Sequence, residues 1–203
     1  MSTPTDNRRA GRPRWIEHIV LIAVAVTIAV VVRTFLVQTF WIPSPSMEPT
    51  LLRDDKVLVN KTAYRFQDPA RGEIVVFAPP AAWSAEPGQN YIKRVIGVAG
   101  DHVVCCDRDR RITVNGRALD EDYLFPGDEP SDRPFDVTVG AGSVFVLGDH
   151  RSASADSREH LDAGGGAVGV DRLVGRAFVT FWPPGRSRTL SVPGTFAGVP
   201  DPR

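Results

Sequence analysis

The sequence has 203 residues, which is enough for one globular core of ordinary size and a short appendage. Its 24 basic and 24 acidic side chains cancel, so the overall charge provides no attraction for a polyanion, and we expect no nucleic-acid partner. The two cysteines, Cys105 and Cys106, are adjacent and have no second pair to complete a zinc site, so we expect neither a metal nor a cofactor.

A polar, basic segment at the N-terminus precedes a long apolar run. Arginines among Gly, Pro, Ser and Thr make residues 1–14 too polar to bury a core, and we expect a disordered tail. From Ile19 to Val32 every residue except Thr27 is apolar, which predicts an uncleaved transmembrane anchor over residues 15–37. A cleavable signal sequence is the alternative, but it needs a small-x-small cleavage site that the bulky and charged residues after Val32 do not provide.

The distribution of arginine predicts the topology of this anchor. Arg8, Arg9, Arg12 and Arg14 precede the apolar run, and few basic residues follow it directly. The positive-inside rule therefore places the N-terminus in the cytoplasm and the rest of the chain, from about residue 40, outside. We expect a single-pass protein of the cell membrane with an extracytoplasmic domain, and the lipid bilayer as a partner.

Short runs of β-type residues follow the anchor and predict an all-β domain over residues 38–182. Asn115-Gly116 predicts a two-residue hairpin, because a type I′ turn needs positive φ at both central positions. Cys105 and Cys106 either form a vicinal disulfide or remain free thiols, and the sequence leaves both open. Residues 183–203, rich in Pro and Gly, are expected to be a loose C-terminal tail. The expected strands are 56–59, 73–77, 91–98, 102–105, 112–114, 137–139, 143–147 and 174–182.

Two serines lie on a stiff backbone directly after the predicted anchor. Three prolines within seven residues fix φ and push the preceding residues toward extended geometry, so Ser44 and Ser46 follow a rigid, non-helical path. A rigid backbone can position a nucleophile. The structural alternative is a proline-rich linker in which the serines have no chemical role.

Lys93 is one of three lysines in a chain with 21 arginines, and only lysine can lose its proton near neutral pH. Strand alternation places Lys93 on the same face as Tyr91 and Val95. If that face is covered, desolvation lowers the pKa of the amine from about 10.4, and a neutral amine can deprotonate a serine hydroxyl. The alternative is an edge-strand lysine that extends into solvent.

Residues 146–158 place many hydroxyl groups and charges directly after an apolar strand. An exposed turn is one interpretation. The other is that these side chains orient a catalytic lysine, with Ser154 near the amine and Asp156 paired with Arg158.

Four segments share their residues and their order with a known enzyme family. They follow an N-terminal apolar run, the similarity extends over residues 15–182, and four matches are far more specific than one. On these segments the chain resembles the type I signal peptidases. The segments are Pro-Ser-x-Ser-Met-x-Pro-Thr-Leu (43–51), Arg-Gly-Glu-Ile-Val-Val-Phe (71–77), Tyr-Ile-Lys-Arg-Val-Ile-Gly-x-x-Gly-Asp (91–101), and Gly-Asp-x-Arg followed by Ser-x-Asp-Ser-Arg (148–158).

The resemblance implies a mainly β fold with a single N-terminal transmembrane helix, and an activity that removes signal peptides from exported preproteins. On the matching positions, Ser46 is the nucleophile, Lys93 the general base and Ser154 the hydroxyl that orients the amine. The Ser46 N–H and the Ser44 hydroxyl would form the oxyanion hole, and the protein would work as a monomer. The remaining implied roles are structural support from Asp149, Asp156 and Arg158, and two shallow substrate pockets lined by Phe40, Ile42, Met47, Leu51, Tyr91 and Ile92.

Two positions depart from the family pattern. Pro45 stands where some members have Gly, and we expect it to stiffen the loop, because its missing N–H is not an implied oxyanion donor. His150 stands where Asn is frequent, and we expect a structural role.

Three alternatives remain. A Ser-His-Asp hydrolase using His150 or His160 with Asp149 or Asp162 leaves Lys93 without a role. A self-cleaving repressor-type protease shares the Ser-Lys dyad, but residues 1–40 resemble no DNA-binding segment. A membrane-tethered β domain that binds a partner without catalysis predicts no turnover.

Overall fold

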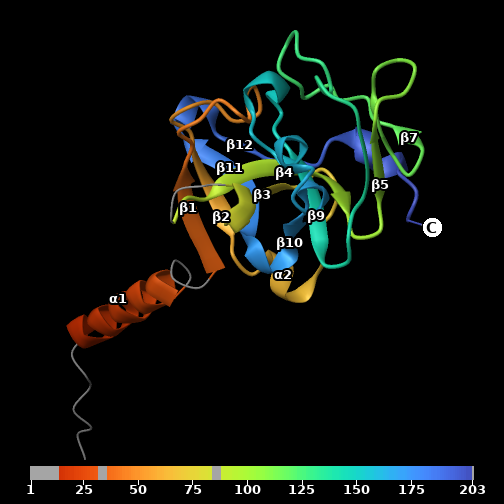
Figure 1. Ribbon diagram of the computed structural model, residues 1–203. Helices are drawn as coiled ribbons and strands as arrows, with labels where there is room; N and C mark the ends of the chain where they lie inside the picture. Colours follow the sequence, from red (N-terminus) through yellow and green to blue (C-terminus); the bar gives the residue numbers. More distant parts are fainter. Residues whose placement is uncertain (1–13, 32–35, 84–87, 203) are drawn as a thin grey trace, which may run out of the picture. The chain divides into compact units, whose positions relative to one another are not determined.

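The computed structural model describes residues 14–31, 36–83 and 88–202 (Figure 1). The chain divides into two compact units, residues 1–36 and 37–203. In the first unit, helix α1 spans Arg14–Val31 and exposes most of its apolar side chains. Within the described ranges, no helix meets the combined requirements of length and hydropathy for crossing a bilayer. The predicted tail up to residue 13 and the anchor residues 32–35 lie outside the described residues.

The second unit begins earlier than the sequence indicates. Strand β1 spans Val37–Trp41 and pairs with β2, which spans Lys56–Asn60, so Val37 lies opposite Asn60 in a sheet. The predicted anchor ends at residue 37, whereas Val37 is the first residue of β1. Apolar residues such as Val, Phe and Trp also occur in buried strands, so hydropathy alone does not separate the end of an apolar helix from the start of a strand.

An antiparallel sheet forms the main layer of this unit (Figure 1). The strand order is β1-β2-β11-β3-β4-β9-β10, with β12 beside β11. Strand β4 lies inside the sheet between β3 and β9, and both of its faces are covered, so all six of its interior residues are buried. The further strands are β3 (Ile74–Phe77), β4 (Tyr91–Val98), β9 (Ser143–Leu147), β10 (Val168–Gly169), β11 (Leu173–Trp182) and β12 (Arg188–Thr189).

A second, four-stranded sheet has the order β7-β6-β5-β8. Its strands are β5 (His102–Cys105), β6 (Ile112–Val114), β7 (Arg117–Ala118) and β8 (Phe135–Thr138). Asn115 and Gly116 join β6 to β7 with φ of 51° and 79°, which confirms the predicted hairpin. Cys105 and Cys106 form a vicinal disulfide, the first of the two possibilities that the sequence allowed.

Short helical turns connect the strands. They lie mainly in the segments between β9 and β11 and after β11, where Gly and Pro are frequent. They are α2 (Ala63–Phe66) and the 3₁₀ turns η2 (Ala81–Trp83), η3 (Arg151–Ala153), η4 (Ser157–His160), η5 (Gly164–Gly166), η6 (Val170–Arg172), η7 (Pro184–Arg186) and η8 (Gly194–Gly198).

The C-terminal residues pack against the domain, so the prediction of a loose tail is wrong for residues 183–202. Leu190, Phe196 and Val199 are buried, and Arg71 donates hydrogen bonds to the carbonyl oxygens of Val199 and Pro200. In Figure 1 the C-terminus lies beside the small sheet. The prolines and glycines of this segment set tight turns, and a few buried apolar side chains between them supply the attachment.

Candidate active site

Ser46 lies in a loop, residues 42–55, that connects β1 to β2. The two ends of the loop are joined by backbone hydrogen bonds of 2.9 Å from Ile42 N to Asp55 O and from Asp54 N to Ile42 O. Inside the loop, Leu51 N donates to Met47 O at 2.8 Å. The loop is therefore compact, and Ser46 is only 4% exposed.

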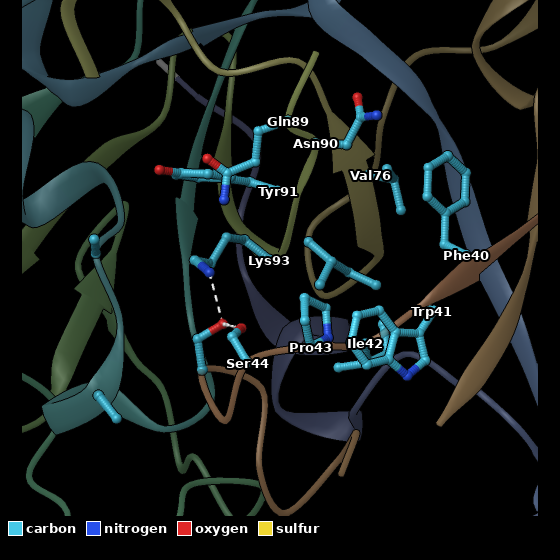
Figure 2. Close-up of a pocket in the computed structure, with 14 residues that line it drawn as sticks. Phe40, Trp41, Ile42, Pro43, Ser44, Val76, Gln89, Asn90, Tyr91 and Lys93 are labelled. Atoms are coloured by element: carbon cyan, nitrogen blue, oxygen red, sulfur yellow. Dashed lines mark hydrogen bonds between the residues drawn. The ribbon is translucent and has the colours of Figure 1, made fainter. Parts of the chain in front are cut away.

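Lys93 approaches Ser46 from strand β4. Its Nζ donates a hydrogen bond of 2.8 Å to Ser46 Oγ, and Ser44 Oγ lies 3.2 Å from the same oxygen (Figure 2). Lys93 is 5% exposed, so the face that strand alternation assigned to it is indeed covered. The structure thus brings together three residues that the sequence had placed in two separate segments.

Burial makes the Lys93 amine easier to deprotonate. Desolvation lowers the pKa of Lys93 to about 8; the negative charges of Asp156 and Asp149 oppose this effect, and the positive charge of Arg158 adds to it. An amine with this pKa has a substantial neutral fraction at mildly alkaline pH. The neutral amine has a free lone pair. It can therefore accept a proton from the Ser46 hydroxyl across the same 2.8 Å contact.

A buried ion pair between Arg158 and Asp156 holds in place the segment beside the Lys93 amine. Arg158 donates from Nε and Nη2 to the two carboxylate oxygens of Asp156, each at 2.9 Å, and Gly148 N donates to Asp156 Oδ2 at 3.0 Å. Burial alone raises the pKa of Asp156, but the hydrogen bond and charge of Arg158 outweigh it, so this pKa lies below its ordinary value. Asp156 therefore stays ionised, as the predicted pairing with Arg158 requires.

Ser154 lies close to the loop that carries Ser46. Its Oγ is buried and has no partner in hydrogen-bonding geometry among the described residues. A Cβ on Gly148 would come within 2.3 Å of Ser154 Oγ and 2.4 Å of the Ser46 carbonyl oxygen. Glycine at position 148 thus allows Ser154 and the backbone of Ser46 to approach each other, which neither residue's local sequence indicates.

A second buried ion pair connects three elements. Arg94, adjacent to Lys93 but on the opposite face of β4, donates to both oxygens of Asp149 at 2.8 and 2.6 Å. Thr50 Oγ1 donates to the same carboxylate at 2.5 Å. Asp149 thus joins β4, the loop that carries Ser46 and the segment after β9, and the sequence did not indicate the part that Arg94 plays.

Ser46 and Lys93 line a cleft of about 270 Å³, which Figure 2 shows. Of the six residues predicted to line substrate pockets, Phe40, Ile42, Tyr91 and Ile92 line this cleft. Met47 and Leu51 do not, because both side chains are completely buried in the core beneath the loop. The cleft is also lined by residues that were not predicted, which are Trp41, Pro43, Val76, Gln89, Asn90, Ala153 and Ala155. The small side chains of Ala153 and Ala155 on either side of Ser154 were the signal that was overlooked.

The histidines of the alternative triad have other partners. His150 stacks on Phe125 with ring centroids 3.9 Å apart, and its Nδ1 lies 3.3 Å from Pro45 O. His160 stacks on Trp83 at 4.4 Å. The side-chain contact that Ser46 makes with a base is with Lys93, which removes the reason for a Ser-His-Asp assignment. Within the described ranges, no three His, Cys, Asp or Glu side chains form a group suited to a metal ion.

A buried amine in contact with a serine hydroxyl at the floor of a mainly apolar cleft is typical of serine hydrolases in which lysine replaces the usual imidazole. Comparison with known proteins identifies the group within that class. The family described as "Signal peptidase, peptidase S26" matches residues 15–182. The chain belongs to this family and is a serine peptidase.

Individual relatives agree over most of the chain. A "Probable signal peptidase I-2" of Synechocystis sp. is 41% identical, covering 88% of this chain and 79% of its own. A "Signal peptidase I" of Leptolyngbya laminosa is 37% identical, covering 96% and 95%. A solved signal peptidase I from Enterococcus faecalis V583 is 29% identical with a TM-score of 0.41, covering 54% of this chain and 97% of its own.

Proposed function

We propose that this protein is a membrane-bound endopeptidase that removes N-terminal signal peptides from exported preproteins, with Ser46 as nucleophile and Lys93 as general base. Its relatives are called signal peptidases, and their names support signal peptides as the substrate. The observation that carries the mechanism is the 2.8 Å contact between a buried Lys93 Nζ and Ser46 Oγ.

In the first step, neutral Lys93 accepts the Ser46 hydroxyl proton while Oγ attacks the scissile carbonyl carbon. The carbonyl π electrons move onto oxygen and give a tetrahedral oxyanion. The Lys93 ammonium then donates its proton to the departing amine, the C–N bond breaks, and the signal peptide remains as an ester on Ser46. In the second step Lys93 takes a proton from water, the hydroxide attacks the ester, and Ser46 Oγ leaves with the proton returned by Lys93.

The developing oxyanion needs donors placed before the reaction begins. We assign this role to the Ser46 backbone N–H and the Ser44 hydroxyl, which lies 3.2 Å from Ser46 Oγ. Pro45, between them, removes one backbone donor and restricts the loop, so both donors keep a fixed spacing. Ser154 would hold the amine through its buried hydroxyl once substrate excludes water, while Asp149, Asp156 and Arg158 keep the surrounding backbone in place.

Substrate would bind as an extended strand across the cleft. Phe40, Ile42, Tyr91 and Ile92 offer an apolar surface, and a shallow cleft of about 270 Å³ favours small side chains near the cut. The apolar run that precedes β1, from residue 15 to residue 36, would anchor the protein in the bilayer with the N-terminus in the cytoplasm and the domain outside. Enzyme and preprotein would then meet on one membrane surface, and we propose that the enzyme acts as a monomer.

The test uses the full-length protein in detergent with a precursor peptide that carries Ala-x-Ala before the cut. We expect one defined cleavage, which Ser46→Ala and Lys93→Arg abolish, because arginine keeps the charge but cannot lose its proton. Ser131→Ala and Lys56→Arg are matched controls outside the cleft and should keep wild-type rates. Absence of turnover in the wild type would favour a non-catalytic binding domain, and cleavage that survives Lys93→Arg would eliminate the Ser-Lys mechanism.

A further inference from the structure

The C-terminal segment touches the loop that carries the proposed nucleophile. We define the nucleophile loop as residues 42–55 and the C-terminal clamp as residues 186–190. The family match ends at residue 182, so the clamp follows it in the chain. Neither Arg186 nor Arg188 lines the cleft, and neither has a role in the chemistry described above.

Arg186 binds the end of the nucleophile loop. Its Nε and Nη2 donate to Asp55 Oδ1 at 3.0 and 2.6 Å, and the Asp55 side chain is only 4% exposed. The other carboxylate oxygen of Asp55 accepts a hydrogen bond of 2.9 Å from Leu52 N. One carboxylate therefore ties the inside of the loop to the clamp, and without Arg186 it would be buried and short of a partner.

Arg188 binds the middle of the same loop. Its Nη2 donates to the carbonyl oxygen of Thr50 and lies 3.4 Å from that of Pro49. The Thr50 hydroxyl donates on its other side to Asp149. Thr50, four residues after the nucleophile, is therefore held between the clamp and the buried ion pair of Asp149 and Arg94.

The clamp itself is attached to the main sheet. β12 pairs with β11, with Thr189 opposite Val179 and Arg188 opposite Thr180. Leu190 N donates to Phe178 O at 2.9 Å, and the Leu190 side chain belongs to the same core cluster as Met47 and Leu51. The clamp is thus attached to the sheet through β12 and Leu190, while Arg186 and Arg188 bind the loop.

We infer that the C-terminal clamp positions the nucleophile: Arg186 and Arg188 hold the loop so that Ser46 Oγ stays in reach of Lys93 Nζ. Both are positioning residues, because they act through Asp55 and the backbone of Thr50. The inference rests on the proposed function and adds to it a part of the chain outside the family match. A shift of about 1 Å at a reacting atom can cost about 100-fold in rate, so loosening the loop should slow the chemistry.

The test compares the double variant Arg186→Gln/Arg188→Gln with the wild type, both full-length and in detergent micelles. We would measure kcat and KM on the Ala-x-Ala precursor peptide, and Ki for a peptide aldehyde ending in Ala-x-Ala. The aldehyde probes position directly, because Ser46 Oγ adds to its carbonyl carbon and the hydroxyl proton passes through Lys93 to the aldehyde oxygen. Arg172→Gln is the control, since its guanidinium also donates to a carbonyl, that of Pro79, away from the loop.

We expect kcat of the double variant to fall between about 10-fold and 100-fold with KM unchanged, and Ki for the aldehyde to rise by the same factor. The Arg172→Gln control should keep all three values. A fall in kcat with an unchanged Ki would mean that fewer molecules are folded, and this result would overturn the inference. Full activity of the double variant, or a change in its KM alone, would also overturn it. If the wild type is not inhibited by the aldehyde, or Ser46→Ala still cleaves, the proposed function itself is wrong and the inference falls with it.

Discussion

Replacing Lys93 with methionine should abolish activity and make the protein more stable. Burial lowers the pKa of Lys93 from 10.5 to about 8, and each unit corresponds to about 1.36 kcal/mol, so keeping the charged amine buried costs about 3 kcal/mol at pH 7. Methionine has a similar volume and no charge. Losing the hydrogen bond to Ser46 removes about 1 kcal/mol, so we expect a net gain of about 2 kcal/mol in the free energy of unfolding.

The pH dependence of this gain gives a sharper check. Between pH 8 and about 10.5 the unfolded wild-type chain binds more protons at Lys93 than the folded protein does, so wild-type stability rises with pH in this window. Lys93→Met lacks this effect, and its advantage should largely disappear by pH 10. Urea unfolding of the full-length proteins, followed by tryptophan fluorescence at pH 7 and pH 10, measures both values. A destabilised variant, or an advantage that does not change between the two pH values, would refute the reasoning.

Three further predictions concern the reaction. In the proposed mechanism the neutral amine of Lys93 is the reactive form, so kcat/KM should rise with pH along a limb with an apparent pKa near 8; a profile that is flat from pH 6 to 9 would contradict it. Ser44→Ala should lower kcat about 100-fold with little change in KM, as the loss of one oxyanion donor does elsewhere, and an effect confined to KM would reassign Ser44 to substrate binding. Gly148→Ala should also lower kcat about 100-fold, because its Cβ would come within 2.4 Å of the Ser46 carbonyl oxygen; wild-type turnover would show that the backbone relaxes without moving the nucleophile.

The local patterns of the sequence predicted much of the sheet. β4, β5, β6 and β9 have the expected bounds, because alternating or continuous apolar runs between turn residues specify strands well. β1 was hidden by the apolar run before it, and the two-residue strands β7, β10 and β12 are too short to produce any pattern. Their pairing depends on neighbours that are distant in the chain.

The candidate site was likewise predictable only in part. Ser46 and Lys93 were predicted as partners, and the structure places them in contact. Met47 and Leu51 were expected in the pocket but lie in the core, since a sequence motif does not say which way each side chain of an irregular loop points. The ion pair of Arg94 with Asp149 joins residues 55 positions apart, and no local pattern connects them.

The clamp also has a consequence for the order in which this protein matures. A ribosome makes the N-terminus first, so the nucleophile loop emerges more than 130 residues before Arg186, which binds Asp55 from 131 positions further along the chain. Residues 186–188 must therefore be synthesised before the loop acquires these supports. A truncation that removes residues 186–190 would thus affect the proposed reaction centre without changing any residue that lines the cleft.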